Sequence, residues 1–209
     1  AEADFTQALQ FAPDNRTYIM LRADTRSEQG NYTQALEDID YLLNREPKSP
    51  SLLFEKGIIC LNRKDTLCAL HNFTETTEYD SQNAANWSAL GMVNLMMNSE
   101  EDALIHLNKA ILLGSKWAGD YINRGIIYYR KHNYRGALAD YDKAVQLAPN
   151  ESDCYYNRGI LRHELGDYNN ALADFNRAID LSADNMNMRY QRAVTLLQLL
   201  PYEIGHLGK

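Results

Sequence analysis

The sequence predicts an all-α solenoid, in which antiparallel helix pairs stack side by side. The chain superposes on itself when it is shifted by 34 residues, and each copy contains two helix-length stretches with apolar residues at three- and four-residue intervals. A short polar break separates the two stretches, as at residues 28–32, 131–134 and 165–168. These observations indicate a repeated helix–turn–helix unit.

Small and large residues alternate between the two helices in a way that favours close packing. The first helix carries a small residue at one fixed place, namely Ala23, Gly57, Gly91, Gly125, Gly159 and Ala193. The second helix carries an alanine and, four residues later, a large residue: Phe5, Ile39, Phe73, Leu107, Tyr141 and Phe175. We expect the small residue to let the second helix approach and the large residue to fill the remaining space. Pro13, Pro47 and Pro149 then end the second helix, because proline cannot donate the helical hydrogen bond.

This pattern resembles the tetratricopeptide repeat, a helix–turn–helix unit of 34 residues. The best match has Tyr155, Gly159, Tyr168, Ala171, Phe175 and Ala178 at the signature places of that repeat. The most divergent copy has Thr66 and Thr76 at two of those places. The resemblance implies a right-handed α–α superhelix, or solenoid, whose first helices line the concave surface.

The resemblance also divides the chain into five complete repeats between two incomplete ones. Residues 1–15 correspond to the second helix of a truncated repeat, and residues 186–209 to the first helix of a sixth repeat plus a tail. The complete repeats are expected at 16–49, 50–83, 84–117, 118–151 and 152–185.

Composition excludes some classes of partner. The 209-residue chain is 45% hydrophobic and 23% charged, which is typical of a folded protein. Its net charge of −7 argues against a general nucleic-acid binder, which needs a basic face. No apolar run approaches the roughly 20 residues that a membrane-spanning helix needs. We therefore expect no nucleic-acid partner and no membrane insertion.

Three cysteines, Cys60, Cys68 and Cys154, include no CxxC pair. Isolated thiols packed as small apolar side chains are the expectation. That favours a reducing compartment such as the cytoplasm, while an exported or periplasmic location stays open.

Arginine recurs at the seventh place of the first helix, where the tetratricopeptide repeat usually has a large apolar residue. Aspartate stands sixteen residues later in the same copies, and a buried charge needs a partner. A guanidinium group can hold a carboxylate with two hydrogen bonds. The alternative, in which the arginines contact a ligand, stays open. The predicted structural ion pairs are Arg22–Asp38, Arg124–Asp140 and Arg158–Asp174.

The resemblance assigns several places of the first helix to the concave groove. In this chain they are mostly apolar or aromatic, and large exposed apolar patches commonly mark interaction sites. Burial of this face against neighbouring helices is the competing interpretation. The candidate groove residues are Phe54, Ile58, Met92, Ile122, Asn123, Ile126, Tyr129, Tyr156, Asn157, Ile160, His163, Tyr190 and Gln191.

Asn123, Asn157 and Gln191 fill the sixth place of three successive copies. A row of carboxamides offers donors and acceptors to the backbone of an extended peptide. Alternatively, each asparagine bonds within its own repeat. A carboxylate clamp, which some members of this family use for a peptide C-terminus, is not expected, because the fifth and ninth places are almost all apolar and only Asn157 matches one element.

No catalytic or metal-binding pattern emerges from the sequence. His163 and Glu164 resemble the start of an HExxH motif, but Asp167 stands where the second histidine belongs. There is no glycine-rich phosphate loop or nucleophile elbow. We therefore expect a protein that is not an enzyme and has no cofactor.

The leading functional hypothesis is an interaction scaffold that binds a peptide or a partner's helix in its concave groove. A second hypothesis is a substrate-recruiting arm of a larger enzyme or transport assembly. A third is self-association through the exposed repeat ends, because a solenoid end without a polar cap exposes apolar surface.

Overall fold

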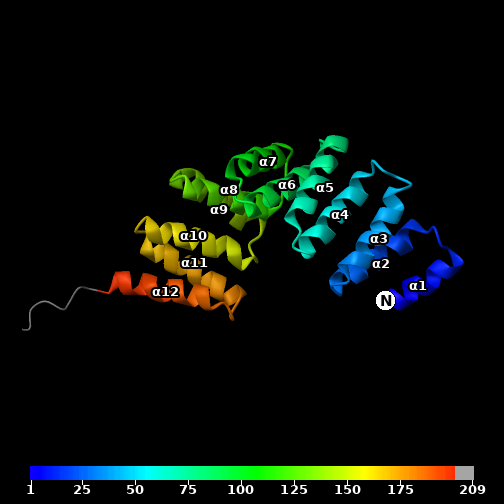
Figure 1. Cartoon of the computed structure of the whole chain (residues 1–209). Helices are drawn as coiled ribbons and strands as arrows, with labels where there is room; N and C mark the ends of the chain where they lie inside the picture. Colours follow the sequence, from blue (N-terminus) through cyan, green and yellow to red (C-terminus); the bar gives the residue numbers. More distant parts are fainter. Residues whose placement is uncertain (201–209) are drawn as a thin grey trace, which may run out of the picture. The chain divides into compact units, whose positions relative to one another are not determined.

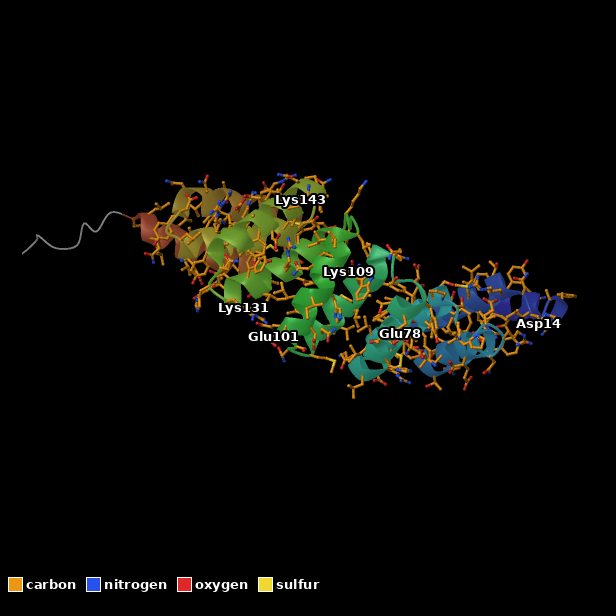
Figure 2. The ribbon with its side chains drawn as sticks, turned by 90° about the horizontal axis from the view of Figure 1, so that it is seen from above. Asp14, Glu78, Glu101, Lys109, Lys131 and Lys143 are labelled. Carbon is orange, nitrogen blue, oxygen red and sulfur yellow. A yellow bond between two sulfur atoms is a disulfide. The ribbon has the colours of Figure 1, made fainter. Side chains whose placement is uncertain are left out.

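Helices make up nearly all of the computed structural model, which describes residues 1–200 (Figure 1). No strand occurs in that range, so the all-α prediction is confirmed. The chain forms two compact units, Ala1–Ser115 and the part from Lys116 onward. The predicted tail at 201–209 lies outside the described residues. The labelled Asp14, Glu78, Glu101 and Lys131 are exposed (Figure 2).

The first unit contains seven helices within the described range. They are α1 (Glu2–Phe11), α2 (Arg16–Glu28), α3 (Tyr32–Leu43), α4 (Pro50–Asn62), α5 (Thr66–Tyr79), α6 (Ala84–Met96) and α7 (Glu100–Leu112). The pairs α2–α3, α4–α5 and α6–α7 pack internally, α3 also contacts α4, and α5 also contacts α6. Helix α1 packs on α2 in the same way as a second helix.

The second unit repeats this arrangement with five helices in its described part. They are α8 (Ala118–Arg130), α9 (Tyr134–Leu147), α10 (Ser152–Glu164), α11 (Tyr168–Leu181) and α12 (Met186–Leu199). The pairs α8–α9 and α10–α11 pack internally, and α12 packs on α11. The first helices also touch one another, α8 with α10 and α10 with α12, so their side chains share one face.

The turn between the two helices of a repeat reverses the chain through one residue with positive φ. Gly166 has φ +78°, and its successor Asp167 donates a backbone hydrogen bond to Arg162 O at 2.9 Å. This bond spans the helix end as in a Schellman motif. Lys64 and His132 take the left-handed conformation at the corresponding positions of other repeats. The turn therefore reverses the chain in each of these repeats, and its residue with positive φ need not be glycine.

Glycine does matter where the two helices of a pair touch. A Cβ atom on Gly159 would lie 2.8 Å from Phe175 Cε1, and one on Gly125 would lie 2.5 Å from Tyr141 Cε1. Both distances are too short for carbon atoms in contact. The large residue of the second helix therefore occupies the space left by the missing side chain.

The expectation of isolated thiols is wrong for two of the three cysteines. Cys60 on α4 and Cys68 on α5 form a disulfide with a Cα–Cα distance of 5.8 Å, whereas Cys154 is free and buried. The two cysteines flank the turn of one helix pair, so the antiparallel geometry brings them face to face at a sequence separation of 8. Disulfides persist in oxidising compartments. The cysteine argument for a reducing compartment therefore no longer applies to this pair.

Candidate peptide-binding face

The three predicted arginine–aspartate pairs each join the two helices of one helix pair. Each arginine donates through Nε and Nη2 to the two carboxylate oxygens of its aspartate, and all three aspartates are buried. The two distances are 3.0 and 2.6 Å for Arg22–Asp38, 2.8 and 2.7 Å for Arg124–Asp140, and 3.0 and 2.7 Å for Arg158–Asp174. Two parallel hydrogen bonds fix the relative position of the helices as well as neutralising the charge.

A second arginine, one helical turn later, joins two of these pairs. Arg26 Nη1 donates to Asp38 Oδ2 at 2.8 Å, and Arg162 Nη1 donates to Asp174 Oδ2 at 2.8 Å. The repeat pattern did not indicate either contact, although Arg26 and Arg162 occupy the same place in their repeats. Each of these aspartates therefore bridges two guanidinium groups.

The repeat that has Leu90 at the arginine place uses a neutral pair instead. Asn94 Nδ2 lies 3.0 Å from His106 Nδ1, and His106 takes the place of the aspartate. Burial lowers the pKa of His106, which favours the uncharged ring. In the third repeat, an uncharged hydrogen bond thus joins the two helices in place of the buried ion pair.

The candidate groove residues of the second unit lie on α8, α10 and α12. Most of them are half-buried between neighbouring first helices, and only Tyr190 is largely exposed, at 65%. The half-buried members are Ile122, Asn123, Ile126, Tyr129, Tyr156, Asn157, Ile160, His163 and Gln191. Neighbouring helices therefore cover part of this face, and the rest of it is accessible to solvent.

Hydrogen bonds occupy part of this face. The hydroxyl of Tyr129 bonds to Glu164, and His163 Nδ1 lies 2.9 Å from Thr195 Oγ1, so both link adjacent first helices. Burial, together with the bond to Glu164, raises the pKa of Tyr129 to about 12. Asn157 donates through Nδ2 to its own helix at Asp153 O, 2.8 Å away. This bond uses one amide proton of Asn157.

The first unit has a hollow of about 540 Å³ on the corresponding side. Of the predicted groove residues, Phe54 lines it, whereas the half-buried Ile58 and Met92 do not. The lining residues are Met20, Pro50, Ser51, Phe54, Glu55, Asp80, Asn83, Ala85 and Asn86.

An acidic pair outside the predicted groove residues lies beside this hollow, which Glu55 lines. The carboxyl groups of Glu55 and Asp24 interact, and burial followed by the charge of Asp24 raises the pKa of Glu55 from 4.5 to about 7. Burial also raises the pKa of Asp24. Asp24 Oδ1 is inaccessible to solvent and accepts no hydrogen bond from the described residues. The pair therefore retains a proton at pH values where ordinary carboxyl groups have lost theirs.

The raised pKa of Glu55 predicts that the stability of the folded protein depends on pH. Folded Glu55 binds its proton more tightly than unfolded Glu55, so the free energy of unfolding should fall as the pH rises from about 4.5 to about 7. Glu55→Gln should remove about 1 to 2 kcal/mol of that decline, after allowance for solvent screening. Urea unfolding at several pH values measures the effect. The exposed Glu37→Gln is the control, and an equal pH dependence in wild type and Glu55→Gln would contradict the prediction.

Residues 1–200 contain no group of three or more histidine, cysteine, aspartate or glutamate side chains that could hold a metal ion. Within the same range, no helix has both the length and the apolar character needed to cross a bilayer.

Stacked helix pairs that share a first-helix face define an α-solenoid repeat protein. Tetratricopeptide repeat family models match residues 20–66 and 130–195. The chain belongs to the tetratricopeptide repeat family. The repeats support a role as a protein–protein interaction scaffold.

Curated relatives match only part of the chain. A protein SGT1 homolog of Bos taurus is 35% identical over 81 residues, covering 39% of this chain and 24% of that protein. The Homo sapiens homolog is 29% identical over 101 residues, covering 48% of this chain and 28% of that protein. The chain thus spans about a quarter of the length of these relatives.

Solved structures share the fold over most of the chain. The Cut9–Hcn1 hetero-tetramer of APC/C matches with a TM-score of 0.81 and 14% identity, covering 93% of this chain and 39% of that chain. YrrB, described as a TPR protein with an unusual peptide-binding site, matches with a TM-score of 0.67 and 19% identity, covering 92% and 100%. At these identities the likeness shows the fold alone.

Proposed function

We propose that this protein binds a peptide or a partner's helix against the face formed by α8, α10 and α12. The observation that supports this most directly is the combination of side chains on that face. Asn123, Asn157 and Gln191 occupy equivalent places on three adjacent helices, with Tyr156 and the exposed Tyr190 beside them. Amides and tyrosines together provide hydrogen bonds and apolar contact area, a mixture that is common at interfaces.

An extended peptide is the ligand that this chemistry favours. A carboxamide both donates and accepts, so a row of amides can pair with successive peptide groups irrespective of the ligand side chains. The bond from Asn157 Nδ2 to Asp153 O holds the amide in one orientation. An amide that is already oriented loses little conformational freedom on binding, which favours affinity. Ile122, Ile126 and Ile160 add half-buried apolar surface on the same helices.

The test begins with a displayed library of random peptides selected against the full chain. The tightest peptide, labelled with a fluorophore, is then titrated by anisotropy with wild type and the triple variant Asn123→Ala, Tyr156→Ala, Asn157→Ala. We expect a loss of affinity of about tenfold or more, because tyrosines and desolvated polar groups contribute much of the energy of interfaces.

The control variant carries Gln146→Ala and Asn169→Ala, which remove two exposed amides from the second helices α9 and α11. It should bind as wild type does. Circular dichroism establishes that both variants keep their helical content. An unchanged affinity in the folded triple variant would exclude the proposed face.

A further inference from the structure

The hollow in the first unit combines apolar walls with acidic side chains. Met20 on α2 and Phe54 on α4 are half-buried apolar residues that line it, and Ala85 on α6 adds a third. Glu55 and Asp80 are its acidic lining residues, and none of the described residues that line it is lysine or arginine. Its volume of about 540 Å³ falls within the roughly 300 to 1,000 Å³ that is usual for ligand pockets. The lining therefore suits a ligand that has an apolar stem and a positive charge.

The carboxyl groups of the hollow lack a positive partner. The side chain of Asp80 forms no hydrogen bond or ion pair with the described residues. Glu55 interacts with the carboxyl group of Asp24, and the charge of each opposes the charge of the other. Asp24 Oδ1 is inaccessible to solvent and accepts no hydrogen bond from residues 1–200. Partly buried carboxylates without a cation are unfavourable, so a positive group in the hollow would be stabilised by all three.

Basic side chains on the surrounding elements have other partners. Arg16 donates through Nη2 to Ser51 Oγ at 2.8 Å. Lys56 pairs with a carboxylate of α3 at 2.7 Å. Lys48 lies over the ring of Tyr79, with its Nζ 5.8 Å from the ring centroid. These three residues therefore leave the carboxyl groups of the hollow without a counter-charge from the surrounding elements.

The first unit is also strongly acidic as a whole. Residues 1–115 contain 17 aspartates and glutamates against 9 lysines and arginines, whereas residues 116–209 contain 11 against 12. A surplus of acidic groups attracts a basic partner and raises the rate of its association. Charge complementarity therefore favours a basic peptide at the hollow over an acidic or a neutral one.

We propose that the hollow of the first unit binds an arginine side chain of a partner peptide. The methylene stem of the arginine lies against Met20 and Phe54, and its guanidinium group bonds to Glu55 and Asp80. Arginine fits better than lysine, because its planar group presents five donors and stacks on aromatic rings. This site lies in a different unit from the face on α8, α10 and α12, and it does not depend on the function proposed for that face.

NMR spectroscopy of the isotope-labelled full chain tests the proposal with a capped peptide, Gly-Gly-Arg-Gly-Gly. The side-chain carboxyl resonances of Glu55 and Asp80 should shift and saturate as this peptide is added. A peptide with citrulline in place of arginine keeps the shape of the side chain without its charge, and it should bind about tenfold more weakly or worse. The corresponding lysine peptide should also bind more weakly than the arginine peptide, and equal affinities would overturn the choice of arginine.

The variant Glu55→Gln removes the charge of one carboxylate and keeps its size. Its affinity for the arginine peptide should be about tenfold lower than that of wild type. Glu78→Gln changes an exposed residue of α5 outside the hollow, so this control should bind as wild type does. The backbone amide spectra establish that both variants are folded.

Three outcomes would overturn the proposal. They are equal affinities for the arginine and citrulline peptides, an unchanged affinity in the folded Glu55→Gln variant, and the absence of a saturable shift at Glu55 and Asp80. Binding of the peptide selected for the face on α8, α10 and α12, measured on Glu55→Gln, reports separately on the proposed function.

Discussion

Asp174→Ala is expected to lower the free energy of unfolding by about 3 to 5 kcal/mol, the range for breaking a buried ion pair. Asp174 is only 3% exposed, and it accepts two hydrogen bonds from Arg158 and one from Arg162. Alanine would leave two guanidinium groups together in a partly buried site without the buried carboxylate that bridges them, and only the more exposed Asp142 would remain as a counter-charge. Chemical denaturation followed by circular dichroism measures the loss.

Asp142→Ala provides a matched control, because Asp142 pairs with the same arginine. Its side chain is 44% exposed, and Arg158 Nη1 donates to it at 2.8 Å. An exposed ion pair is usually worth less than about 1 kcal/mol, so this variant should remain close to wild type. Equal losses in the two variants would show that burial of Asp174 does not determine the strength of its ion pairs.

These ion pairs show which contacts a sequence with a clear period can reveal. Arg158 and Asp174 belong to one repeat, and the spacing recurs in other copies, so the pairing is visible as a repeated residue combination. Arg162 is different, because the sequence does not indicate that Asp174 can accept from two arginines at once. Only the structure shows that Asp174 accepts hydrogen bonds from both Arg158 and Arg162.

Contacts between repeats were harder to predict than contacts within them. Asp24 and Glu55 come from successive first helices, and nothing in either helix alone places their carboxyl groups together. Whether they meet depends on how one helix pair is rotated relative to the next. The same reasoning applies to Tyr129 and Glu164, which the repeat pattern assigns to a common face without indicating their hydrogen bond.

The disulfide between Cys60 and Cys68 should also contribute strongly to stability. Closing a loop at a sequence separation of 8 restricts the unfolded chain by about 2.5 kcal/mol in the loop-entropy description. Cys60 is fully buried on α4, so the bond also holds two helices of the most divergent repeat together. Reduction with dithiothreitol should therefore lower the melting temperature of the wild type.

The variant Cys60→Ala with Cys68→Ala separates this effect from other actions of the reductant. It keeps the buried Cys154, so any influence of reductant on that thiol remains in both proteins. Its melting temperature should not respond to dithiothreitol. Thiol titration of the unfolded wild type provides an independent measure, with one free thiol before reduction and three afterwards. Three free thiols in protein purified without reductant would show that the bond does not form. Its proposed role in holding α4 against α5 would then have to be abandoned.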